Sequence, residues 1–159
     1  MTEHVSVAVS RRTECGEGPV WDAAGITVNI LTDQEAYLVD KATTVTTDIL
    51  TANADADMIW ASNEGGTAGA TIAVQQAGKK IPVFGTDISK QLGEFVIADD
   101  DILQATTGQD PVGTAQGAYE MAKKVIDGGT NDPHAVELPG IVYDRANPAT
   151  TEEFLKTAQ

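Results

Sequence analysis

The sequence predicts an α/β fold, in which an open and mostly parallel sheet carries helices on both faces. Short apolar runs rich in Val, Ile and Leu alternate along the chain with longer segments of helical periodicity. Five such runs are separated by helices, and neighbouring parallel strands need a crossover of about a dozen residues, usually a helix. The 159 residues suffice for one hydrophobic core and not for two full lobes.

Two strands are predicted near the start of the chain. Residues 4–10 alternate polar and apolar side chains, and residues 26–31 are β-branched and apolar. Residues 14–25 between them are rich in turn formers and predict a loop. A parallel crossover needs a helix here, so either one sheet face near the first strand lacks its cover or this strand pairs in another way.

A helix is predicted for residues 33–53, with Asp33 as its N-cap. Its apolar residues keep to one face at helical spacing, namely Leu38, Val39, Ala42, Val45, Ile49 and Leu50. The threonines within residues 43–47 weaken this prediction, because β-branched side chains disfavour helix slightly.

The rest of the chain continues the alternation. Strands are predicted at 57–62, 80–87 and 102–110, helices at 65–78 and 89–100, and a short strand and a helical turn at 140–145 and 151–158. Residues 112–128 form a helix that Pro111 begins and Gly128 and Gly129 end. Its predicted apolar face consists of Val112, Ala115, Ala118, Met121, Ala122 and Val125.

Charge and composition exclude several classes of function. The formal net charge is −14, so phosphate backbones and anionic lipids would repel the chain, and we expect neither nucleic acid nor a membrane surface as a partner. The single cysteine, Cys15, excludes an internal disulfide. The sequence shows no signal peptide, cofactor fingerprint, metal-ligand spacing or catalytic constellation, so we expect no cofactor, no metal and no enzyme activity.

Polar side chains follow three consecutive predicted strands. Asn63 comes after the strand at 57–62, Asp87 ends the strand at 80–87, and Gln109 lies near the end of the strand at 102–110. In open parallel sheets, ligands bind beyond the carboxyl ends of the strands. Amides and a carboxylate suit a ligand rich in hydroxyls, such as a monosaccharide, although such residues also serve as ordinary caps and turns.

The segments "SNE", "GTD" and "TGQDP", with the order of elements around them, resemble the C-terminal lobe of type I periplasmic sugar-binding proteins, the receptors of ATP-binding-cassette sugar importers. The resemblance covers residues 22–159 and leaves residues 1–21 as an atypical head. It implies a flavodoxin-like or Rossmann-like lobe in which Asn63, Asp87 and Gln109 contact a sugar or polyol. It also implies a membrane permease as partner and a periplasmic or extracellular location, although no signal peptide is recognisable.

The chain departs from this family in length. It has about half the residues of such receptors, so the N-terminal lobe and the first helix of the C-terminal lobe have no counterpart, and we expect weak sugar binding. The helix at 112–128 lacks its usual partner lobe. Its apolar face is expected to fold back on the uncovered sheet or to dock on a second copy, giving a homodimer, including a domain-swapped one.

Other interpretations remain open at this point. The head "GEGPVWD" resembles the start of the gluconolactonase and senescence-marker family, in which the Glu matching Glu17 binds a metal. If both resemblances hold, the chain is a chimera of two gene pieces or a truncated gene product. The alternatives for function are a non-binding half-receptor that dimerises, a sugar-sensing repressor core that lacks its basic helix-turn-helix, and a metal-dependent lactonase resting on Glu17 alone.

Overall fold

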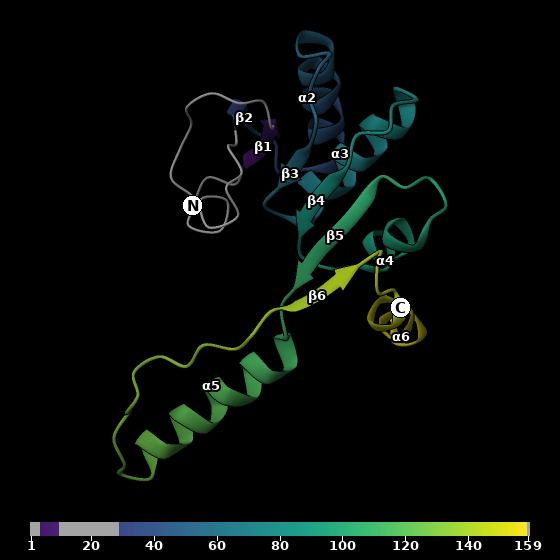
Figure 1. Cartoon of the computed structure of the whole chain (residues 1–159). Helices are drawn as coiled ribbons and strands as arrows, with labels where there is room; N and C mark the ends of the chain where they lie inside the picture. Colours follow the sequence, from purple (N-terminus) through teal and green to yellow (C-terminus); the bar gives the residue numbers. More distant parts are fainter. Residues whose placement is uncertain (1–3, 10–28, 159) are drawn as a thin grey trace.

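A computed structural model describes residues 4–9 and 29–158. The elements in chain order (Figure 1) are β1 (His4–Val9), β2 (Asn29–Glu35), α2 (Val39–Ala52), β3 (Ile59–Ala61), α3 (Glu64–Gln76), β4 (Val83–Thr86), α4 (Lys90–Ile97), β5 (Leu103–Gly108), α5 (Pro111–Ile126), β6 (Ile141–Asp144) and α6 (Ala149–Thr157). None of the helices in these ranges is long and apolar enough to cross a membrane.

The strands form one sheet in the order β2-β1-β3-β4-β5-β6. The β3–β4 and β4–β5 pairs are parallel, whereas β1 pairs antiparallel with both β2 and β3, and β6 pairs antiparallel with β5. The four strands β2, β3, β4 and β5 therefore run in the same direction, opposite to β1 and β6. The predicted fold class, α/β with an open and mostly parallel sheet, is confirmed. The expectation of helices on both faces is not met among the described residues, because the helices that pack on the sheet share one face.

The first two strands show why no crossover helix was found between them. β1 and β2 are antiparallel neighbours, from His4 opposite Glu35 to Val9 opposite Asn29. An antiparallel pair needs only a returning connection. The predicted strand at 26–31 is observed as Asn29–Glu35, while its first residues and the predicted loop at 14–25 lie outside the described residues.

The predicted start of the next helix is wrong. Asp33 is not an N-cap but lies within β2, opposite Ser6, because pairing with β1 keeps the chain extended through Glu35. α2 begins at Val39, and its N-cap residue Leu38 makes no side-chain capping bond. The threonines are tolerated inside α2 because several hydroxyls donate to the carbonyl four residues earlier, as Thr43 does to Val39 at 2.8 Å.

Four helices pack on the same face of the sheet. Gly85 of β4 faces α3, because a Cβ there would lie 2.2 Å from the Thr67 side chain. Gly85 pairs with Thr106, and Thr106 pairs with Tyr143, whose ring packs edge-on against Phe154 of α6 at 5.5 Å. Paired residues point to one face, so α3 and α6 share it. α2 packs against α3, and α4 packs against both α3 and α6.

The core lies between this face and its helices. Its largest fully buried apolar side chains come from the inner strands and from the helices that cover them: Ile59, Val74, Val83, Leu92, Val96 and Leu103. The parallel strands β3, β4 and β5 thereby hold their carboxyl ends at one edge of the sheet. That edge is where the predicted polar side chains lie.

α5 leaves the body of the molecule. Asp110 caps it by accepting from the Gly113 amide at 2.8 Å, as expected for a helix that Pro111 begins. None of its residues is buried, and it projects away from the sheet (Figure 1). The expectation that its apolar face folds back on the chain's own sheet is therefore wrong for this structure.

Candidate functional site

The carboxyl ends of β3, β4 and β5 open into two adjoining hollows. One, of about 460 Å³, is lined by residues that include Asp87, Gln109 and Tyr143. The other, of about 350 Å³, is lined by residues that include Tyr37, Asn63 and Asp87. Asp87 and Glu64 line both hollows. The three side chains selected from the sequence therefore lie along one continuous rim.

Asn63 is the N-cap of α3 and is only 8% exposed. Its Oδ1 accepts from the Gly66 amide at 3.0 Å, and its Nδ2 donates to the Tyr37 carbonyl at 3.0 Å. These two bonds leave one lone pair of Oδ1 and one N–H of Nδ2 available. Asn63 therefore begins the helix and anchors the chain before α2, and it also lines the smaller hollow.

Asp87 occupies the position directly after β4. Its backbone is in the left-handed region, at φ 73°, which Asp adopts more readily than most residues because its short side chain can bond locally. β5 holds this residue from two sides, since the Asp87 amide donates to the Thr107 carbonyl at 2.7 Å and the Thr106 hydroxyl donates to the Asp87 carbonyl at 2.6 Å. The carboxylate is thus fixed in direction.

One oxygen of that carboxylate is engaged by the protein. Asp87 Oδ2 accepts from the Glu64 amide at 3.1 Å, at the N-terminus of α3. The helix dipole favours a negative charge at this end. No bond to Oδ1 is present among the described residues. Asp87 therefore presents one oxygen to the hollow while the other holds it in place.

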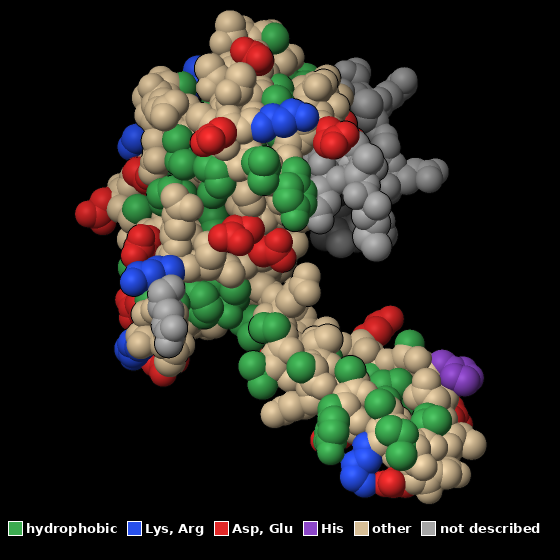
Figure 2. All heavy atoms as spheres, turned by 180° about the vertical axis from the view of Figure 1, so that it is seen from behind, with side chains coloured by type: hydrophobic (Ala, Val, Ile, Leu, Met, Phe, Trp, Pro, Cys, Tyr) green, Lys and Arg blue, Asp and Glu red, His purple; other side chains and the backbone are tan. Residues whose placement is uncertain are grey.

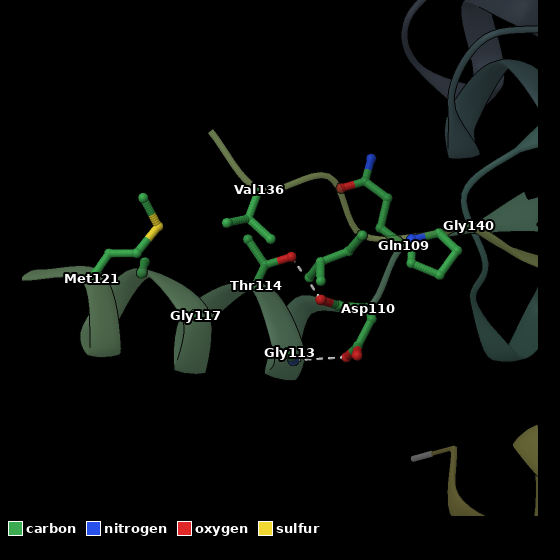
Figure 3. Close-up of a pocket in the computed structure, with 11 residues that line it drawn as sticks. Gln109, Asp110, Gly113, Thr114, Gly117, Met121, Val136 and Gly140 are labelled. Carbon is green, nitrogen blue, oxygen red and sulfur yellow. Dashed lines mark hydrogen bonds between the residues drawn. The ribbon is translucent and has the colours of Figure 1, made fainter. Parts of the chain in front are cut away.

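Gln109 connects the body to α5. It is exposed and makes no hydrogen bond with any of the described residues. It lines the larger hollow of the rim and also a further hollow of about 410 Å³ between α5 and residues 136–140. Figure 3 shows its side chain beside Gly140, at the base of α5. The amide is free to bind a ligand from either side.

Tyr37 is a site residue that the sequence pattern did not indicate. It lies between β2 and α2, is 58% exposed and lines the smaller hollow beside Asp87. Its carbonyl is held by Asn63, and it passes so close to α3 that a Cβ on Gly65 would lie 2.3 Å from that oxygen. An exposed tyrosine next to asparagine, glutamate and aspartate offers a flat apolar surface edged by polar groups. In the sequence, Tyr37 fell inside the helix predicted at 33–53, so the pattern gave no signal for a site residue there.

The charge at the rim is negative. Glu64, Asp87 and Asp110 all line the larger hollow, and no lysine or arginine lines either hollow among the described residues. Tyr143 adds a phenol beside them, and burial raises its pKa, so its hydroxyl keeps its proton at neutral pH and can both donate and accept. Such a site suits a neutral polyhydroxyl compound and disfavours anions.

Within the described ranges, no three His, Cys, Asp or Glu side chains come together as a metal site. Glu17, on which the lactonase alternative rests, lies outside the described residues, as do Cys15 and the rest of the gluconolactonase-like head.

Most of the chain matches a known protein family. The family model described as "Periplasmic binding protein domain" matches residues 17–130. No curated protein matches the chain.

Solved structures share the fold. A periplasmic solute-binding protein of an ABC transporter from Actinobacillus succinogenes 130z, with bound D-allose, is 31% identical with a TM-score of 0.63, over 71% of this chain and 40% of that protein. An ABC sugar transporter subunit from Rhodobacter sphaeroides 2.4.1 is 26% identical with a TM-score of 0.63, over 69% and 40%. A periplasmic ribose ABC transporter protein from Conexibacter woesei DSM 14684 is 23% identical with a TM-score of 0.66, over 75% and 40%. The matched part of this chain thus spans about 40% of the length of each.

Proposed function

Because the chain belongs to the periplasmic binding protein family, whose members are solute-binding receptors rather than enzymes, we propose that it binds a monosaccharide or polyol through the rim that Asn63, Asp87 and Gln109 line. The chain then acts as the C-terminal sugar-binding lobe of an importer receptor. Relatives with bound D-allose and L-arabinofuranose support sugar as the ligand class.

The observation that carries this proposal is the fixed carboxylate of Asp87. Its backbone is held by Thr106 and Thr107, and one of its oxygens is held by the α3 N-terminus. A carboxylate fixed in advance loses little conformational entropy when two hydroxyls of a sugar bind to it. Charge-assisted hydrogen bonds of this kind are about twice as strong as neutral ones.

Two neighbouring side chains complete the proposed half-site. Gln109 both donates and accepts, so it can bind one hydroxyl in either sense. Tyr37 supplies a flat apolar surface for the C–H face of a sugar ring, and its backbone is already anchored by Asn63. Stacking and directed hydrogen bonds together discriminate a sugar ring from a flexible polar molecule.

The acidic rim narrows the ligand class further. Glu64, Asp87 and Asp110 would repel a sugar phosphate or a sugar acid, whereas a neutral sugar can donate to these carboxylates and also bind the uncharged groups of Gln109 and Tyr143. We therefore expect neutral pentoses, hexoses or polyols to bind and their phosphorylated or oxidised counterparts not to bind.

The affinity of this chain alone is expected to be low. This chain covers only 40% of the matched solved structures, so we expect it to contact only one side of the ligand. Each missing hydrogen bond costs about 1 kcal/mol, and several missing bonds lower the affinity by several orders of magnitude. A membrane permease is the proposed partner only of a complete two-lobed receptor. We place this receptor in the periplasm with the rest of the family.

Calorimetry with a panel of neutral sugars tests the proposal, with Asp87→Asn as the site variant. Asparagine keeps the shape and the tolerance for positive φ, and it still accepts from the Glu64 amide, so the fold is retained. Loss of the charge is expected to weaken sugar binding roughly ten- to a hundred-fold, in line with about 1.5–3 kcal/mol for bonds to a charged group.

The matched control is Asp48→Asn, which removes the same charge from an exposed position of α2 remote from the rim. We expect it to bind the sugar as the parent does. The proposed site is wrong if no neutral sugar binds the parent even at tens of millimolar. It is also wrong if both variants bind the sugar as tightly as the parent does.

A second candidate is a half-receptor whose main interaction is with another copy of itself. Two observations favour it: no residue of α5 is buried, and the chain covers only 40% of a matched solved structure. Its interface is considered next.

A further inference from the structure

The face of the sheet that the helices leave uncovered carries large apolar side chains. Trp60 is 40% exposed in the middle of β3, whereas its neighbours Ile59 and Ala61 point to the helices and are fully buried. Trp60 pairs directly with Phe84 of β4, and Phe84 with Ala105 of β5, so all three lie on the uncovered face. This open sheet face continues to exposed Ile30 in β2 and Val142 in β6, at its two edges.

α5 presents a second unpartnered apolar surface. Val112, Ala115, Tyr119, Ala122 and Ile126 follow one another at intervals of three and four residues, which places them on one side of the helix. Tyr119 is 67% exposed and Ile126 is 83% exposed. We call these five residues the α5 stripe. The expected apolar face included Met121 and Ala118 but omitted Tyr119 and Ile126.

The opposite side of α5 is already used. Gly113, Gly117 and Met121 line the hollow that the helix shares with residues 136–140 (Figure 3). At about 100° per residue, these positions lie on the far side of the helix from the α5 stripe. The space-filling view shows apolar side chains along the arm that α5 and residues 127–140 form, away from the body (Figure 2). The arm's own contacts therefore leave the α5 stripe open.

We propose that the α5 stripe of one copy packs on the open sheet face of a second copy, and that the second copy returns the same contact. Among the described residues, every copy carries one helix face and one sheet face without a partner, so a twofold arrangement satisfies both at once and closes without further association. A helix of 16 residues is about 24 Å long, whereas neighbouring strands lie about 4.8 Å apart, so the α5 stripe is long enough to cover both Trp60 of β3 and Phe84 of β4.

The chain's own α5 does not fill this role, because it starts beyond the carboxyl end of β5 and projects away from the sheet (Figure 1). Local charge is complementary at this contact, although two chains of net charge −14 repel one another overall. Lys124 in the last turn of α5 would approach the acidic body of the partner, whereas Lys123 already pairs with Asp127. This interface goes beyond the sugar site and does not depend on it.

The test uses two pairs of substitutions that disable one surface each. Tyr119→Lys with Ile126→Lys disables the α5 stripe at exposed positions of a helix, and Trp60→Thr with Phe84→Thr disables the open sheet face with a residue that favours strands. Gln76→Lys with Gln91→Lys is the control, because it adds the same charge at exposed positions on other helices. Light scattering gives the mass, and circular dichroism verifies the fold.

We expect the parent and the control to be dimers and each of the two variants to be a monomer. An equal mixture of the two variants should regain a dimer, since the intact α5 stripe of one meets the intact sheet face of the other. A parent that stays monomeric at all concentrations overturns the proposal. A sheet variant that stays dimeric, or a mixture that stays monomeric, overturns the pairing of helix with sheet and indicates another contact.

Fluorescence provides a second readout that leaves the sheet face unchanged. The chain has two tryptophans, so Trp21→Phe leaves Trp60 as the only one. If the partner's α5 covers Trp60, its emission moves to shorter wavelength as the protein concentration rises, and it does not move when Tyr119→Lys and Ile126→Lys are added. An emission maximum that is independent of concentration in a dimeric sample places the contact elsewhere.

Discussion

Asn63 and Asp87 show that one polar residue can serve the fold and a candidate site together. Asn63 begins α3 and holds the Tyr37 carbonyl, and Asp87 accepts from the same helix end. Interpretation as ordinary caps and interpretation as ligand contacts are therefore compatible for these two residues. Gln109 differs, since nothing in the described residues engages its side chain. Its role depends on a ligand or on a partner.

At the same scale, Thr46 is a buried polar residue without a hydrogen-bonding partner among the described residues. A buried hydroxyl that makes no bond loses its hydration without compensation, at a cost of about 1–3 kcal/mol. Thr46→Val keeps the shape and removes this cost, so we expect the free energy of unfolding to rise by about 1 kcal/mol in urea denaturation.

Thr47→Val serves as the control for this substitution. Its hydroxyl is exposed and donates to the Thr43 carbonyl at 2.8 Å, so its loss is expected to leave stability unchanged or slightly lower. Equal effects of the two substitutions would show that general β-branched helix propensity, and not the buried hydroxyl, determines the result.

At the scale of elements, Arg145 joins the end of α4 to β5 and β6. It follows β6, and its guanidinium donates to the carbonyls of Phe95 and Ala98 at the C-terminus of α4 and to Leu103 of β5. Asp100 and Asp101 lie 3.6 and 3.7 Å from it. A cation at this end of a helix also meets the negative end of the helix dipole.

We predict that Arg145→Met lowers the free energy of unfolding by about 2–4 kcal/mol, because several part-buried carbonyls lose a charged donor at once. Arg145→Lys should recover little of this loss, since one ammonium group cannot reproduce the spread of the guanidinium donors. Urea denaturation of both variants measures the effect. Full stability of Arg145→Lys would show that the charge matters and the donor geometry does not.

At the scale of the whole molecule, charge opposes self-association. Two copies with a net charge of −14 each repel one another, while the α5 stripe and the open sheet face attract through apolar burial. Salt screens the repulsion, since the Debye length falls from about 30 Å at 0.01 M to about 8 Å at 0.15 M.

Raising sodium chloride over this range should therefore lower the dissociation constant of the dimer. Sedimentation at several protein concentrations measures it. A dimer that weakens with salt would contradict an apolar interface and would indicate that ion pairs of Lys123 and Lys124 dominate the contact. The Tyr119→Lys and Ile126→Lys variant is the control, because it should stay monomeric at every salt concentration.

The sequence alone determined most of the local structure and the position of the candidate rim. The helices α3, α4 and α5 and the strands β3, β4 and β5 lie within the predicted ranges or begin one residue before them, because their periodicity and capping residues are local signals. Asn63, Asp87 and Gln109 could be selected because parallel strands bring their carboxyl ends to one edge.

Tertiary structure alone decided three features. Pairing with β1 kept β2 extended through Asp33, against the local signal for a helix cap. The fold brought Tyr37 beside Asp87, although the two are fifty residues apart in the chain. It also left Trp60 and the α5 stripe without partners. Each feature depends on contacts between distant segments or on their absence, and local periodicity reports only which side of an element is apolar, not what covers it.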